Sequence, residues 1–189
     1  MSSWDSPLRN LPLKVLLDTS VVQYLERFGE YIYDNYLSDK LSAKLNSFSK
    51  NIKSDIEALK NIFGPTTRSP VIALISTLSL NELSRTQNEE KREKLLKWGF
   101  ELLEFSDRVS ENYRSSMNKE QILFTDYLKD KFDRLLLGEC RRMECQAFIT
   151  MDYKTILKFR HRLKTEDRIN TLSPSEWWSL LKPWWPLWI

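Results

Sequence analysis

The sequence is poor in the residues that build several common kinds of functional site. Its 189 residues include two cysteines, one histidine and four glycines. These numbers leave no set of Cys and His residues with metal-ligand spacing, and no disulfide framework. No glycine-rich phosphate loop and no nucleophile-elbow motif is present either. The two cysteines, Cys140 and Cys145, suit a reducing compartment, so we expect a cytoplasmic protein.

Long apolar runs are also missing. No stretch approaches the roughly 20 apolar residues that a membrane-spanning helix needs, and residues 1–13 lack the apolar segment of a signal peptide. Apolar residues make up 41% of the chain and charged residues 29%, a balance typical of soluble globular proteins. No repeat or linker divides the sequence, and its length suits one ordinary core. We therefore predict a single domain over residues 1–189 with no membrane partner.

Positive charge is modest overall but concentrated in one run. The formal net charge is only +3, whereas the segment KTILKFRHRLK at 154–164 contains no acidic residue. Its basic side chains are Lys154, Lys158, Arg160, Arg162 and Lys164. One interpretation is an electrostatic footprint for a phosphate backbone, and the other is a solvated helix face. The single histidine, His161, lies in this run and is more typical of a solvated helix residue than of a metal ligand.

Short β-type runs alternate with helical segments along the chain. Strands are predicted at 14–17, 71–78, 102–105, 147–150 and 169–172, and polar, periodic segments span 107–147. The alternation predicts an α/β fold, a three-layer α/β/α sandwich with a central, mostly parallel sheet. Residues 30–70 carry apolar residues at helical spacing and predict an additional helical insertion.

Acidic residues stand where three of the predicted strands end. Asp18 and Asp152 each follow a strand directly, and Glu82 lies in the first turn of a helix that Ser79 is expected to open. Ligands of open parallel sheets bind beyond the carboxyl ends of the strands, so these acids can converge. Helix capping is the structural alternative for each of them.

Gathered carboxylates have an electrostatic cost. Two carboxylates 4 Å apart repel by about 4 kcal/mol at an effective dielectric near 20. Such a cluster persists by raising its pKa values or by binding a divalent cation. The sequence therefore indicates either separate capping residues or an acidic site with affinity for a hard metal ion.

Four segments in this order resemble the PIN-domain family of nucleases. They are KVLLDTSVV at 14–22, ISTLSLNEL at 75–83, DRLLLGECRRMECQAFITMD at 133–152 and INTLSPSEWWSLL at 169–181. Within the third segment spacing selects Asp133 as the acid, with Asp126 and Asp130 close by. The resemblance covers the core of the chain and implies a PIN-like fold with metal-dependent endoribonuclease activity.

The resemblance also implies the composition of the site. Asp18, Glu82, Asp133 and Asp152 would hold one or two Mg²⁺ or Mn²⁺ ions, hard cations that prefer oxygen ligands. A water activated by the ions would attack a phosphodiester bond of single-stranded or looped RNA. The basic run at 154–164 would then flank the acids and contact the RNA backbone.

Three hydroxyl side chains are expected beside the acids. Thr19, Ser20 and Thr150 could hydrogen-bond an acid or a phosphate oxygen, and the alternative is that they cap helices and strand ends. The tryptophan-rich tail at 177–188 predicts packing of the last helix or a protein interface, with base stacking as the third interpretation. An antitoxin-like protein or a second copy of the chain would suit such an interface.

Two other classes of function compete with a toxin-type or RNA-processing nuclease. The first is a catalytically impaired PIN-like module that binds RNA or protein, and the four filled acid positions weigh against it. The second is a response-regulator-like module, in which acids bind magnesium beside a phosphorylated aspartate. That class is disfavoured because Asp18 has no acidic neighbour.

Overall fold

A four-stranded parallel sheet lies at the centre of the computed structural model, which describes residues 10–64, 70–109 and 125–188. Its strands are β1 (Lys14–Leu17), β2 (Ile72–Leu74), β3 (Ala147–Ile149) and β4 (Thr171–Leu172), in the order β2-β1-β3-β4. All three pairings are parallel. The predicted parallel α/β sheet is therefore confirmed, and because parallel strands run in one direction, their carboxyl ends lie at the same edge.

Helices fill most of the described chain. They are α1 (Thr19–Arg27), α2 (Gly29–Tyr33), α3 (Asp39–Ser47), α4 (Lys50–Phe63), α5 (Thr77–Leu83), α6 (Glu89–Val109), α7 (Lys131–Arg142), α8 (Arg160–Thr165) and α9 (Pro174–Leu181), with 3-10 turns η3 (Leu157–Phe159) and η4 (Lys182–Leu187). In the described ranges no helix has the length and apolarity to span a membrane.

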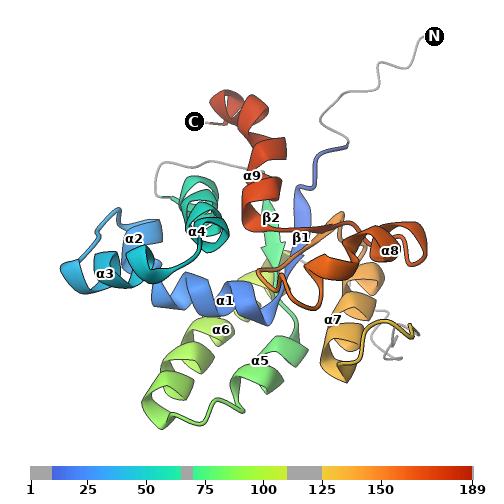
Figure 1. Ribbon diagram of the computed structural model, residues 1–189, viewed down its shortest axis with the longest axis horizontal. Coiled ribbons are helices and arrows are strands. Elements are labelled where there is room, and N and C mark those ends of the chain that lie inside the picture. Colours follow the sequence, from blue (N-terminus) through green and yellow to red (C-terminus); the bar gives the residue numbers. More distant parts are fainter. Residues whose placement is uncertain (1–9, 65–69, 110–124, 189) are drawn as a thin grey trace.

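Alternate residues of β1 face two separate cores. Val15 and Leu17 belong to the core that includes buried side chains of α1, α4 and α9, whereas Leu16 packs with α7 and α8. This period of two is the pleat of a strand that is buried on both faces. Figure 1 shows the consequence, with α2, α3 and α4 on the opposite side of the strands from α7 and α8. The layered α/β sandwich is thus built from apolar side chains on both faces of β1.

The expected insertion is helical where it is described, and it ends against the last helix. Residues 65–69 lie outside the described part, while α2, α3 and α4 occupy most of 30–64. On α4 the residues Ile56, Leu59 and Ile62 are buried, at the predicted helical spacing. The carboxylate of Asp55, on the same face, accepts hydrogen bonds from the backbone N–H of Ser175 at the start of α9 and from the Tyr153 hydroxyl.

Several predicted strands differ in the structure, and β4 begins at Thr171 and not at 169. Residues 102–105 are part of α6, not a strand, because a short apolar run does not distinguish strand from helix by periodicity. The predicted strand at 71–78 is shorter: β2 ends at Leu74, and α5 begins at Thr77 with Ser76 as its cap. The polar segments expected between 107 and 147 include α7, and their part at 110–124 lies outside the described residues.

The aromatic tail packs onto the domain. Trp177 is completely buried, and its indole N–H donates to the carbonyl oxygen of Pro12 over 2.9 Å. Trp185 is buried between Trp178 and Trp188, with ring centroids 4.8 and 5.6 Å away. Helix α9 opens with Pro174 behind a complete Ser173 capping box. The packing interpretation is therefore confirmed for Trp177 and Trp185.

Replacing Trp177 by phenylalanine is expected to lower the free energy of unfolding by about 2–4 kcal/mol. The change leaves a void and removes the donor to the Pro12 carbonyl. Urea denaturation measures the loss. The matched control is Trp184→Phe, a half-buried position, with an expected cost below about 1 kcal/mol. Equal costs for the two variants would contradict a structural role specific to Trp177.

Candidate functional site

Asp18 is the centre of the arrangement at the carboxyl edge of the sheet. It follows β1, is only 5% exposed, and its backbone N–H donates to the Ile149 carbonyl of β3 over 2.9 Å. Its Oδ2 atom accepts hydrogen bonds from the hydroxyls of Ser20, at 2.5 Å, and Thr150, at 2.6 Å. Two strands and the first turn of α1 therefore hold this one carboxylate in place.

The capping alternative does not apply to Asp18. It occupies the N-cap position of α1, yet its side chain makes no capping hydrogen bond. Burial raises its pKa to about 6, the two hydroxyl donors act in the opposite direction, and the charge of Glu82 raises it further. A carboxylate that is buried at such cost and not used as a cap is typical of a functional position.

Asp133 is the second acid with a strongly perturbed pKa. It stands half-buried in the first turn of α7, and no hydrogen bond to its carboxylate occurs among the described residues. Burial is the largest cause of a pKa raised to about 7, and the negative charges of Asp18, Asp130, Asp152 and Glu82 add to it. The four predicted acids thus lie close enough to act on one another electrostatically through Asp133.

The nearby acids that competed with Asp133 have other roles. Asp130 caps α7, since its Oδ1 accepts the N–H of Phe132 at 2.6 Å. Asp126 is exposed and forms an ion pair with Arg162 at 3.3 Å. Asp133 therefore differs from both neighbouring acids, since neither a capping hydrogen bond nor an ion pair engages its carboxylate among the described residues.

Asp152 behaves as a cap. Its Oδ1 accepts the backbone N–H groups of Lys154 and Thr155, both at 2.9 Å, and its Oδ2 accepts the hydroxyl of Thr155. Asp152 thus caps the turn at residues 153–156 and not a helix, because η3 has Ile156 and α8 has Phe159 at its N-cap position. The negative charge of Asp152 still raises the pKa of Asp133.

Glu82 occupies a different position from the expected one. It lies half-buried in the last turn of α5, not at the helix start, because Ser76 caps this helix by accepting the N–H of Leu78 at 3.0 Å. The predicted capping box with Ser79 is wrong: the Ser79 hydroxyl is buried without a hydrogen-bond partner among the described residues. The negative charge of Glu82 raises the pKa values of Asp18 and Asp133, so Glu82 still lies near both acids.

The three expected hydroxyl residues divide into two groups. Ser20 and Thr150 donate to Asp18, and they also accept the backbone N–H groups of Met151, at 3.1 Å, and Asp152, at 3.0 Å. The hydroxyl of Thr19 is buried and has no hydrogen-bond partner within the described ranges. The hydroxyls of Ser20 and Thr150 therefore position Asp18, whereas Thr19 acts on this carboxylate only through its backbone.

The donor chemistry of the cluster fits a hard divalent cation. Asp18 and Asp133 offer carboxylate oxygens whose charge is unfavourable as they stand, and a cation would lower both pKa values. Over the described parts of the chain, however, no three acidic, His or Cys side chains are grouped as a ready-made set of metal ligands. The residues fit such an ion by chemistry, with Asp18 and Asp133 as the best-suited ligands.

Two of the five basic side chains at 154–164 are engaged in ion pairs. Arg160 pairs with Glu176, and Arg162 pairs with Glu166 at 2.7 Å. The remaining cations of the run, Lys154, Lys158 and Lys164, are exposed and form no ion pair in the part of the chain that is described. Within this run, these three lysines are the cations best placed to meet a phosphate backbone.

A hollow beside the acids includes residues that the sequence analysis missed. It has a volume of about 460 Å³ and lies between Asp152 and the start of α4, with Asn51, Ile52 and Tyr153 in its lining. Asp55, which is fully buried, holds the Tyr153 hydroxyl at 2.6 Å. The sequence feature that could have identified Asp55 is its position on the apolar face of α4.

The chain was also compared with known proteins. A scan against protein-family models, a search of curated proteins and a search of solved structures each returned no match. Any function of this chain is therefore inferred from the geometry of the site.

We expect the free energy of unfolding of Asp18→Asn to increase relative to that of wild type as the pH rises. A carboxyl group with a raised folded-state pKa contributes stability below its unfolded value of 3.8, and this contribution is lost as pH rises through about 6. Asparagine cannot ionise, so the stability difference between variant and wild type should grow by on the order of 2 kcal/mol from about pH 4 to about pH 8. Urea denaturation at a series of pH values measures it, and a constant difference would contradict a buried, perturbed Asp18.

The capping role of Asp152 predicts different results for two substitutions. Asp152→Ala removes all three hydrogen bonds and should cost about 1–2 kcal/mol of unfolding free energy. Asp152→Asn keeps an oxygen acceptor for the backbone N–H groups and should cost less than half as much. Thermal denaturation compares the two, and equal losses would show that the carboxylate does not act as a cap.

Proposed function

We propose that this chain is a metal-dependent endoribonuclease that hydrolyses phosphodiester bonds. The observation that carries the proposal is the pair Asp18 and Asp133, two carboxylates from different elements, of which the charge of Asp18 raises the pKa of Asp133. Neither side chain serves as a helix cap. Sites that gather unneutralised acids at this edge are suited to a divalent cation.

Each residue of the site has a role in this proposal. Asp18 and Asp133 would hold Mg²⁺ or Mn²⁺, with Glu82 and Asp152 adding negative charge around it. When bound, the cation would supply positive charge against the phosphate and promote attack by water. Ser20 and Thr150 keep Asp18 in one orientation through their hydrogen bonds, so the carboxylate needs no rearrangement to bind.

The surroundings favour a single-stranded nucleic acid over a small substrate. The hollow of about 460 Å³ beside Asp152 is bordered by the apolar Ile52 and by the polar side chains of Asn51 and Tyr153, which suits an unstacked base. Lys154 lies at the same hollow and is free to contact a phosphate. A strand that places a base there brings its backbone toward the acids.

The proposal is tested with a labelled single-stranded RNA in Mn²⁺, in Mg²⁺ and in EDTA. Wild type is expected to cut the RNA internally in either metal and not in EDTA. Asp18→Asn and Asp133→Asn should each lower the cleavage rate by at least about a hundredfold, because each removes a carboxylate ligand of the cation. The matched control is Asp34→Asn, an exposed acid at the end of α2, which should cut like wild type.

Metal binding gives a second measurement that does not depend on activity. Mn²⁺ should raise the thermal unfolding temperature of wild type and of Asp34→Asn, because a ligand that binds the folded state stabilises it. The rise should be absent in Asp18→Asn. Cleavage that persists unchanged in both site variants would identify a contaminating nuclease. A wild type that neither cuts RNA nor responds to Mn²⁺ would leave a catalytically impaired binding module as the better description.

A further inference from the structure

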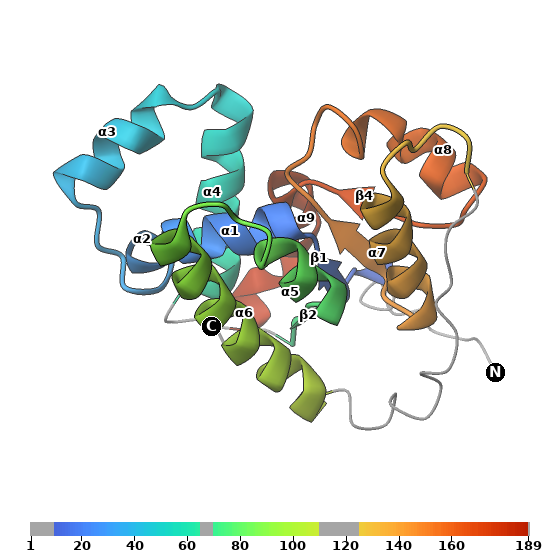
Figure 2. The ribbon, with the colours of Figure 1, turned by 90° about the horizontal axis from the view of Figure 1, so that it is seen from below.

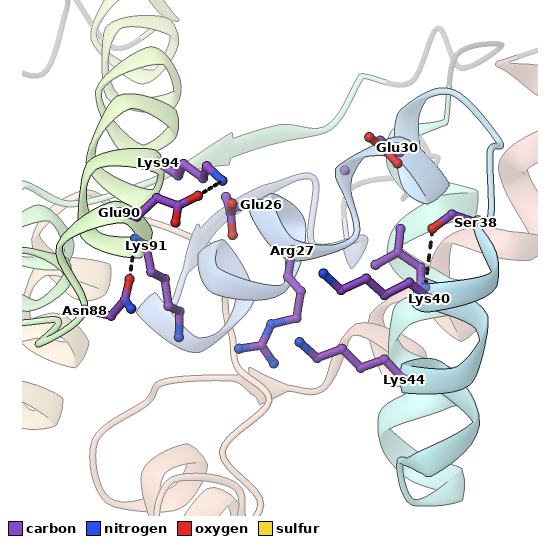
Figure 3. A pocket seen from close by; sticks show the side chains of 12 residues that line it. Glu26, Arg27, Glu30, Ser38, Lys40, Lys44, Asn88, Glu90, Lys91 and Lys94 are labelled. Carbon is purple, nitrogen blue, oxygen red and sulfur yellow. Dashed lines mark hydrogen bonds and ion pairs between the residues drawn. The ribbon is translucent and has the colours of Figure 1, made fainter.

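A second cavity in the molecule lies away from the acids and has the opposite charge. It has a volume of about 750 Å³, is open to solvent, and is bordered by the end of α1, the start of α2, α3 and the first turns of α6. Figure 3 shows the side chains of Arg27, Lys40, Lys44 and Lys91 extending into it from three helices. We call the cavity with these four cations the basic pocket.

The cations of the basic pocket have no ion-pair partners within the described ranges. The acids nearby are Glu26, Glu30 and Glu90, and the last of these is paired with Lys94 at 2.7 Å. The remaining two acids do not neutralise the four cations. Positive charge therefore exceeds negative charge in the cavity.

The arrangement is unfavourable for an empty cavity. Lys40 and Lys44 stand four residues apart on α3, a spacing at which like charges destabilise a helix. Arg27 is the main reason that the pKa of Lys44 is lowered, with desolvation, Lys91 and Lys40 adding to the effect. Helix α3 buries none of its side chains completely and contacts the core only through the half-buried Leu41 and Leu45, so its two lysines remain exposed at the cavity. An anion in the cavity would remove the repulsion.

Helix α1 connects the acidic site to the basic pocket. Asp18 precedes the first residue of α1, and Arg27 is its last residue. Nine helical residues span about 14 Å, so the two sites lie at opposite ends of a short rod. In Figure 2 the end of α1 that carries α2 and α3 lies away from α7, with the strands between them.

From this geometry we infer that the basic pocket binds backbone phosphate of the RNA strand that is cut at Asp18 and Asp133. The inference rests on the proposed function and adds a second anchoring point, about one α1 length from the cleaved bond. An acidic centre repels phosphate, and this pocket provides the compensating attraction at a distance that leaves the acids free for the metal. The insertion at 30–70 would thus hold the substrate, because it supplies Lys40 and Lys44.

The test measures RNA binding apart from cleavage. A labelled single-stranded RNA longer than α1 is titrated in EDTA at several salt concentrations with wild type and with the double variant Lys40→Gln/Lys44→Gln. The double variant should bind at least about tenfold more weakly, and its salt slope should be smaller by about 0.7 for each phosphate that the protein no longer neutralises. Lys97→Gln/Lys182→Gln is the control, since it removes the same charge from exposed positions outside the pocket.

Folding and activity are measured on the same variants. The pocket variant should unfold at or above the wild-type temperature, because it is relieved of like-charge repulsion, so weaker binding would not reflect unfolding. A pocket variant that binds RNA as the control does, or a wild type that binds no RNA, overturns the inference.

The two proposals can fail separately. If wild type cleaves RNA in Mn²⁺ and the pocket variant binds and cleaves like the control, the nuclease stands and the pocket inference fails. If wild type binds RNA through the pocket but cuts nothing in either metal, the nuclease proposal fails, and with it the assignment of the bound strand as a substrate, while the pocket is still shown to bind RNA.

Discussion

The hydrogen bonds from Ser20 and Thr150 to one oxygen of Asp18 are the interaction on which the site depends. They join the end of β1, the first turn of α1 and the end of β3 around a carboxylate that is almost fully buried. Such a group is stable only where fixed donors replace the water that burial removes. The parallel pairing of β1 with β3 places those donors, since both strands end at the same edge.

Asp18 and Asp152 stand in similar sequence contexts but have different roles, because different hydrogen-bond donors surround them. Asp18 and Asp152 both follow a buried strand, but Asp152 turns to the N–H groups of the next turn, whereas Asp18 turns to hydroxyls across the sheet. Asp133 has no such donors, and the negative charges of four neighbouring acids raise its pKa. The division explains why one acid is a cap and two are suited to a cation.

The helical insertion connects the core to both cavities. Its α4 buries Asp55, which binds Tyr153 next to Asp152 and the start of α9, and its α3 supplies two cations of the basic pocket. A buried carboxylate with satisfied hydrogen bonds fixes α4 in one position. The insertion is thus part of the framework around the site as well as an addition to the fold.

The sequence by itself determined the parallel α/β sheet, the helical insertion and the position of Asp18, because these follow from local periodicity and from chain order. It placed the start of α5 three residues too late and assigned residues 102–105 to a strand, since a short apolar run carries no unique period. Only the tertiary structure decided which acids act as caps, that Arg160 and Arg162 are paired, and that Asp55 is buried. It alone brought Arg27 to Lys40, Lys44 and Lys91, because contacts between separate helices depend on how they pack and leave no mark in spacing.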